Sequence, residues 1–122
     1  MRNFKKLEIW NKGIQIVKEI YKVSSSLPSD EKFGLKSQIT RAAVSIPSNI
    51  AEGSGRNSEV EFKRFLEIAL GSLFELETQL IIATELGFFN LEETNLVSKL
   101  VEDECKMINR LISKIKNDAK GQ

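Results

Sequence analysis

The sequence contains no histidine, a single cysteine and only two prolines among its 122 residues. Without histidine, the chain lacks the side chain that most often acts as a general base or as a ligand of transition metals. Cys105 alone cannot form an intrachain disulfide, and a zinc site needs several cysteines or histidines at set spacings. These absences predict a protein that is not an enzyme and that has no metal site, no cofactor and no small-molecule substrate.

Long apolar runs and a strong net charge are also absent. No run approaches the roughly 20 residues that cross a bilayer, and the basic start at Arg2 to Lys6 is not followed by the apolar region of a signal peptide. We therefore expect a cytoplasmic protein with no membrane partner. The net charge of +1 gives no overwhelming attraction to nucleic acid, so such binding would have to come from a local patch.

The chain instead has the composition of a soluble globular protein, with 41% apolar and 29% charged residues. Its length fits one domain over residues 1–122. Apolar residues recur with helical periodicity in four segments, at about 6–25, 32–54, 58–87 and 91–117. No segment alternates with the period of a strand. Short connections favour antiparallel neighbours, so the predicted fold is an all-α, up-down-up-down four-helix bundle.

Local signals mark the helix ends. Ser58 followed by Glu61 has the spacing of a capping box, and Asn90 followed by Glu93 has the same spacing. Gly87 is a natural C-terminal stop. Pro47 lies inside the second helical pattern and predicts a kink or a break there. The residues from Asn117 to Gln122 are expected to fray.

The third segment should be the longest helix, and its apolar residues cover more than one side. A helix of this kind must be buried on more than one side, and we expect another subunit to cover one of them. The fourth helix has a single apolar face. Its expected inward residues are Leu96, Val97, Leu100, Val101, Met107, Ile108, Leu111 and Ile115.

A polar stripe borders the apolar face of the second helix. If the helix continues past Pro47, six residues share an arc of about 80°: Gln38, Arg41, Ser45, Asn49, Glu52 and Arg56. Such residues beside an apolar strip suit a polar network that fixes one assembly geometry. A solvated helix edge explains them equally well, so the oligomer interface and the solvated edge stay open as alternatives.

A basic stripe follows the fourth helix, where Lys99, Lys106, Arg110 and Lys114 fall within about 80°. Such a stripe could follow a phosphate backbone. The nearby acidic residues and the absence of interleaved aromatic residues favour solvated surface over nucleic-acid binding.

Other motifs carry little chemistry. Gly53-Ser54-Gly55 follows a helix rather than a strand and lacks the remaining residues of a phosphate-binding loop, which favours a helix stop and a turn. Cys105 falls at the edge of an apolar face, where an inert, half-buried thiol is usual.

The run from Arg41 to Arg56 resembles the central signature of the four-helix-bundle proteins encoded in intervening sequences of bacterial 23S ribosomal RNA genes. The opening Phe4 to Trp10, the Leu27-Pro28 turn before Glu31 to Leu35, and Glu61 to Glu77 are similar to the same family. The resemblance implies a four-helix bundle that assembles as a ring, typically a homopentamer. The chain is also similar to the accessory variability protein of diversity-generating retroelements, a basic ring that binds a reverse transcriptase and nucleic acid.

This resemblance predicts the fold of the protein better than its role, because the family's own function is unsettled. The chain is nearly neutral whereas the retroelement relative is strongly basic, which weakens the inference of nucleic-acid binding. Two hypotheses follow. The first is an oligomeric scaffold or adaptor with a protein partner, assembled through the third helix and the polar stripe. The alternative is a ring that binds RNA through the basic stripe.

Overall fold

Four helices account for most of residues 2–120, the part of the chain that the computed structural model describes. No strand occurs among these residues. Two short 3-10 helices precede the first and second α-helices. The elements are η1 (Phe4–Lys6), α1 (Glu8–Ser24), η2 (Ser29–Glu31), α2 (Leu35–Ser54), α3 (Glu59–Glu85) and α4 (Leu91–Lys120).

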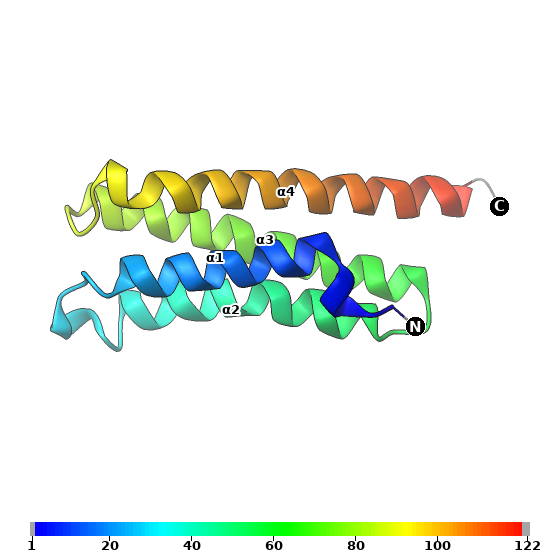
Figure 1. The fold of residues 1–122 in the computed structure, drawn as a ribbon, viewed down its shortest axis with the longest axis horizontal. Helices are drawn as coiled ribbons and strands as arrows, with labels where there is room; N and C mark the ends of the chain where they lie inside the picture. Colours follow the sequence, from blue (N-terminus) through cyan, green and yellow to red (C-terminus); the bar gives the residue numbers. More distant parts are fainter. Residues whose placement is uncertain (1, 121–122) are drawn as a thin grey trace.

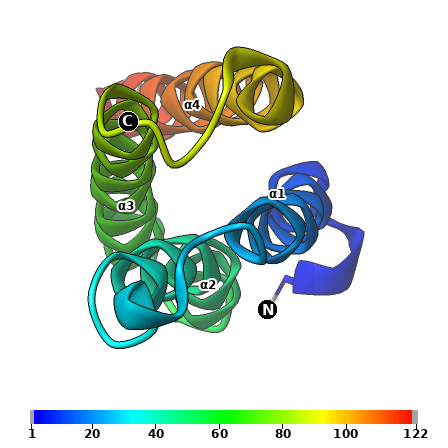
Figure 2. The same ribbon diagram turned by 90° about the vertical axis from the view of Figure 1, so that its left-hand side faces the viewer.

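The helices form the predicted all-α bundle. In Figure 1 the chain reverses its direction at each of the three connections, so that successive helices run antiparallel. Figure 2 views the bundle from one end, with α1 and α3 at opposite corners. Each helix packs against the next one in the chain, and α4 closes the bundle by packing against α1 as well as α3. This arrangement leaves one side of every helix facing outward.

The core lies along the centre of the bundle and draws on all four helices. Complete burial of one such apolar side chain contributes about 1.5–3 kcal/mol to the free energy of unfolding. The buried faces of α1, α2 and α3 largely follow the predicted periodicity. Side chains with no exposed surface occur on each of these three helices: Ile16, Ile20, Ile39, Ala43, Ile46, Ile50, Leu66, Ala69, Leu73, Leu76 and Ala83.

The prediction for α4 was wrong at Leu96, whose side chain is 54% exposed. The neighbouring Val97 enters the core instead, and residues one position apart on a helix point about 100° away from each other. Ile112 is also buried, and so is the charged residue Glu104. The buried face of α4 therefore includes a polar position that a pattern of apolar residues does not reveal.

The predicted caps are present. The Ser58 hydroxyl accepts a hydrogen bond from the backbone N–H of Glu61 at 3.1 Å, and the Asn90 side chain accepts one from the N–H of Glu93 at 2.9 Å. Gly87 has a φ of 83°, a left-handed conformation that suits glycine just after a helix. Ser58 therefore sets the start of α3, and Gly87 and Asn90 set the two ends of the α3 to α4 connection.

Other helix limits differ from the predictions. Of the two starts expected for the second helix, Lys32 or Leu35, α2 has the later one, Leu35, because η2 and a turn occupy the preceding residues. α4 is the longest helix, with 30 residues against 27 in α3. It stays helical to Lys120, so the predicted fraying from Asn117 is wrong over the described residues. The last two residues of that prediction, 121–122, lie outside them.

α2 continues through Pro47 without the predicted break. Pro47 is buried against α1 at Gly13, where an added Cβ would lie 3.3 Å from the Pro47 Cβ. The missing side chain of Gly13 thus leaves room for the proline ring between the two helices. The continuous helix keeps the residues before and after Pro47 on common faces.

The closest approach of α2 to α3 occurs at Gly53. A Cβ added to this residue would lie only 2.5 Å from the Cβ of Phe65. The expected result of Gly53→Ala is therefore a loss of about 1–3 kcal/mol in the free energy of unfolding, because the helices must separate. Chemical denaturation measures this loss.

Gly71→Ala is the matched control. Gly71 also lies within a helix, but an added Cβ there meets no atom within 4 Å. We expect it to stabilise the protein by up to about 1 kcal/mol through helix propensity alone. Equal effects of the two substitutions would contradict the argument from close packing.

Candidate assembly interface

The predicted polar stripe lies on α2 along its seam with α3. Gln38, Arg41, Glu52 and Arg56 are exposed, whereas the two central residues of the stripe, Ser45 and Asn49, are half-buried. The position of the stripe beside the apolar face is thus as predicted. The structure adds that part of the stripe is already engaged within the chain.

Ser45 joins the two helices. Its hydroxyl donates a short hydrogen bond to the hydroxyl of Ser72 on α3, which in turn donates to the Ile68 carbonyl at 3.3 Å. The Asn49 side chain donates to the backbone carbonyl of Ser45 at 2.8 Å. Hydrogen bonds of this kind fix the register of α2 against α3 without placing an unpaired polar group in the seam.

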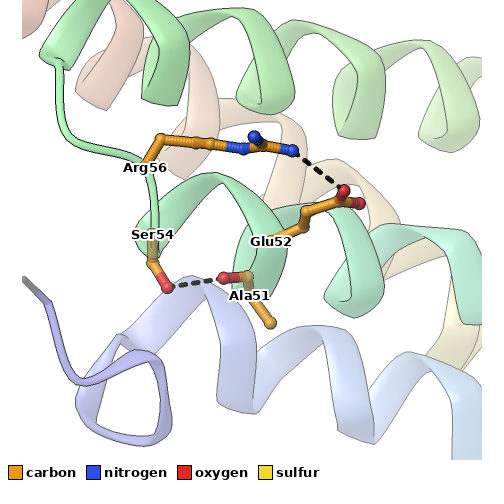
Figure 3. A network of polar contacts seen from close by, with 4 residues as sticks. All are labelled: Ala51, Glu52, Ser54 and Arg56. Carbon is orange, nitrogen blue, oxygen red and sulfur yellow. Dashed lines mark hydrogen bonds and ion pairs between the residues drawn. The ribbon is translucent and has the colours of Figure 1, made fainter.

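The C-terminal end of the stripe contains an ion pair, shown in Figure 3. The Arg56 guanidinium lies 3.1 Å from a Glu52 carboxylate oxygen, and the Ser54 hydroxyl donates to the Ala51 carbonyl at 2.7 Å. The guanidinium also lies 4.9 Å from the centre of the Phe65 ring of α3. Arg56 thereby connects the end of α2 to α3, although an exposed ion pair contributes little stability by itself.

Away from this seam, α3 carries large exposed apolar side chains, and one of them, Ile81, borders α4. Phe74 and Ile81 are 53% and 56% exposed. Gly71 lies among them and leaves open space. These exposed apolar residues form an interrupted row, with exposed Glu67 and Glu75 between them, and exposed apolar groups of this kind can mark an interaction site. We call this row the α3 outer face; its members are Val60, Ile68, Phe74, Ile81 and Ile82.

Gln79 adds an unsatisfied polar group on the same helix. Its amide nitrogen donates to Glu75 at 3.2 Å, but its amide oxygen is buried and accepts no hydrogen bond from the described residues. A buried acceptor without a donor is costly and calls for an explanation. A donor supplied by another molecule would satisfy it.

A second apolar surface lies between α1 and α2. It is a groove of about 280 Å³ whose lining is mainly apolar. We call it the α1/α2 groove; it is lined by Trp10, Ile14, Val17, Val44, Pro47, Ser48 and Ala51. Because α1 and α3 occupy opposite corners of the bundle (Figure 2), the groove and the α3 outer face point in different directions.

All four residues of the predicted basic stripe on α4 are exposed, but two are paired with acidic neighbours. Lys99 lies 3.1 Å from Asp103, and Lys106 lies 3.1 Å from Glu102. The pairing raises the pKa of Lys99 and lowers that of Asp103. Arg110 and Lys114 have no ion pair with the described residues and line one surface hollow with Asn117 and Asp118.

The described residues contain no cluster of three or more histidine, cysteine, aspartate or glutamate side chains that could hold a metal ion. None of the helices described between residues 2 and 120 is both long and apolar enough to cross a membrane. Cys105 is half-buried, as predicted, and burial raises the pKa of its thiol to about 11. A thiol with this pKa is almost entirely protonated at neutral pH and reacts slowly.

Glu104 was not among the residues predicted from the sequence. Its side chain is completely buried, and neither carboxylate oxygen has a hydrogen-bond partner among the described residues. Burial raises its pKa from 4.5 to about 8. One signal was available in the sequence, because Glu104 lies three residues after Val101 and four before Ile108, both on the apolar face.

These features define an all-α four-helix bundle with exposed apolar side chains on α3 and a polar seam between α2 and α3. The profile of the 23S rRNA-intervening sequence proteins matches residues 5–110, and the chain therefore belongs to this family. A solved structure of a protein with unknown function from the S23 ribosomal protein family of Bacteroides thetaiotaomicron has the same fold, with a TM-score of 0.79 and 24% identity. The match covers 85% of this chain and 97% of that one. None of the curated proteins compared with the chain matches it.

The hydrogen bond between Ser45 and Ser72 gives a first test of the seam. We expect Ser45→Ala and Ser72→Ala each to lower the free energy of unfolding by about 0.5–1.5 kcal/mol, because each leaves a hydroxyl or carbonyl with one partner fewer. The double variant should lose clearly less than the two single losses added together. Chemical denaturation of all four proteins measures the coupling, and strict additivity would show that the two hydroxyls do not interact.

Proposed function

We propose that this protein is a non-enzymatic scaffold or adaptor that works by assembling into a closed ring of identical subunits. The single observation that carries the proposal is the α3 outer face, with Phe74 and Ile81 more than half exposed. Burying such side chains against another subunit is favourable by about 25 cal/mol for each Å² of apolar surface. The chain belongs to a family for which we expect rings, typically homopentamers, and this expectation supports the same proposal.

The polar seam on the α2 side of the same helix offers further groups to an interface. Gln38 and Arg41 extend the stripe beyond the residues engaged with α3, and their exposed side chains have no hydrogen bond or ion pair with the described residues. The unpaired amide oxygen of Gln79 lies on the helix that faces them. An interface with an apolar centre and a polar rim commonly uses such arginine and amide groups for specificity.

The shape of the two apolar surfaces favours a head-to-tail contact. The α3 outer face presents exposed side chains such as Phe74, which we call the ridge, whereas the α1/α2 groove is a hollow of about 280 Å³ at another side of the bundle. Complementary surfaces that differ from each other give a heterologous contact, and heterologous contacts generate rings when the rotation closes. We therefore propose that the ridge of one subunit enters the groove of the next.

Phe74→Glu tests the assembly. A charge in the apolar contact should convert an oligomer well above the 13.8 kDa of one chain into a folded monomer. Light scattering measures the mass, and circular dichroism checks that the helices remain. Phe33→Glu is the matched control, because Phe33 is 88% exposed in the connection between α1 and α2, away from both surfaces; it should leave the oligomer intact. A wild-type protein that is monomeric at tens of micromolar would refute the proposal.

A mixing experiment tests the head-to-tail geometry. Phe74→Glu damages the ridge, and Val44→Glu damages the groove. Each variant alone should be monomeric, and an equal mixture should form a dimer through the one intact ridge and the one intact groove. A Val44→Glu protein that still assembles alone would favour a contact of α3 with its own copy.

RNA binding by the ring is the second candidate function. The observation that favours it is the pair of unpaired cations, Arg110 and Lys114, in one surface hollow of α4. In a ring these hollows would repeat around the assembly and multiply the local positive charge. The ion pairs of Lys99 and Lys106 weaken their contribution, so the candidate rests on half of the predicted stripe.

Fluorescence anisotropy with a structured RNA at about 50 mM salt tests this candidate. Binding should weaken steeply as salt increases, because each neutralised phosphate releases counterions. Arg110→Glu should reduce affinity several-fold more than Lys99→Glu, since Lys99 already has an acidic partner. Undetectable binding to RNA and to single-stranded DNA, or equal effects of the two variants, would reject it.

A further inference from the structure

Glu104 is a carboxyl group enclosed by three helices. It lies on α4 with no exposed surface, and one of its oxygens is 3.4 Å from the place where a Cβ of Gly13 would be. The same place is 3.3 Å from the Cβ of Pro47 on α2. The missing side chain of Gly13 therefore creates the space in which the carboxyl group meets α1 and α2.

This space offers Glu104 no hydrogen-bond donor among the described residues. Pro47, the α2 residue at the Gly13 contact, has no backbone N–H to donate. Neither oxygen of Glu104 accepts a hydrogen bond from the described residues. A carboxylate needs donors, whereas a neutral carboxylic acid supplies one itself. The surroundings of Glu104 thus favour the protonated form, as its raised pKa of about 8 also indicates.

The charged groups that influence Glu104 come from one helix. Burial is the main cause of its raised pKa; Lys12 on α1 lowers the pKa and Glu8 on α1 raises it. Among the described residues of α2 and α3, no charged group contributes to this shift, and α2 presents only Pro47 at the Gly13 contact. On α4 itself, Asp103 forms an ion pair with Lys99, and Lys106 forms one with Glu102. Lys12 is therefore a cation available to an ionised Glu104, and Arg110, which has no ion pair with the described residues, lines the same groove between α1 and α4.

The seam between α1 and α4 is also the place where the bundle is already hollowed. A groove of about 310 Å³ is lined by Glu8 and Lys12 together with residues of α4. A second groove, of about 250 Å³, continues along the same seam past Ile9. Lys12, the cation that lowers the pKa of Glu104, therefore lies in a surface groove between α1 and α4.

We propose that Glu104 is a proton-controlled latch: as a neutral acid it keeps α1 packed on α4, and its ionisation opens the seam between these helices to solvent. Ionisation would place an unpaired charge in the core, which is strongly unfavourable. Separation of α1 from α4 relieves this cost, because it admits water and brings Lys12 within reach of the carboxylate. The latch does not depend on the proposed assembly, since all its parts belong to one chain.

The first experiment measures folding equilibria between about pH 5.5 and 8.5. The folded chain keeps the Glu104 proton up to about pH 8, whereas the unfolded chain releases it near 4.5, so stability falls as pH rises through this range. We expect the folding equilibrium constant to fall by up to about tenfold per pH unit. The pKa of Cys105 is about 11 in the folded chain and 9.0 when unperturbed, so this thiol adds to the slope only at the alkaline end of the range, equally in all variants that keep it, and Asp103 titrates below the range.

Glu104→Gln copies the shape of the neutral acid and should remove this pH dependence. Glu102→Gln is the matched control, because Glu102 is an exposed carboxylate on the same helix; it should keep the wild-type slope. Glu104→Met provides a second neutral variant should the glutamine variant fail to fold. Equal slopes in the wild type and in the folded neutral variant would overturn the latch.

The second experiment separates opening of the seam from unfolding of the whole bundle. In a Cys105→Ser background, Ile9→Cys places a thiol on the buried face of α1, and Ala69→Cys places one in the core on α3. With rates normalised to an exposed cysteine, alkylation of Ile9→Cys should accelerate at least about tenfold between pH 6 and 8.5. Ala69→Cys should stay protected, and adding Glu104→Gln should abolish the acceleration. Parallel acceleration at both positions, or at neither, would overturn the proposal.

Discussion

The close packing of α2 on α3 is the constraint on which the other surfaces depend. Gly53 brings the backbone of α2 against Phe65, and the Ser45 to Ser72 hydrogen bond holds the register along the seam. Once α3 is fixed in this way, its inward residues fill the core and its remaining apolar residues face solvent. The outward position of Phe74 is therefore a consequence of tight packing on the other side of the same helix.

The number of helices, their order and most of their core residues could be predicted from the sequence, because apolar periodicity and capping residues such as Ser58 are local signals. The unbroken course of α2 through Pro47 could not be predicted from the sequence, since it depends on the space that Gly13 leaves on another helix. Glu104 was missed because a search for apolar faces passes over a charged residue, although its spacing from Val101 places it on the buried face.

The candidate interface likewise has some features that the sequence predicts and others that only the tertiary structure reveals. Spacing along α2 placed Ser45 and Asn49 beside the apolar face, but only tertiary structure reveals that Ser45 bonds to Ser72. The pairing of Lys99 with Asp103 could have been anticipated, because residues four apart on a helix are neighbours. Local contacts of this kind reduce the charge that a stripe presents, so counting cations along a helix overstates its attraction for phosphate.

Cys105 shows what burial means for the handling of this chain. It is the single cysteine of the sequence, and its pKa of about 11 leaves roughly one thiolate in ten thousand molecules at neutral pH. Oxidation and disulfide exchange proceed through the thiolate. The folded protein is thus intrinsically resistant to covalent cross-linking in air, and a dimer linked through sulfur would be a sign that some molecules had unfolded during storage.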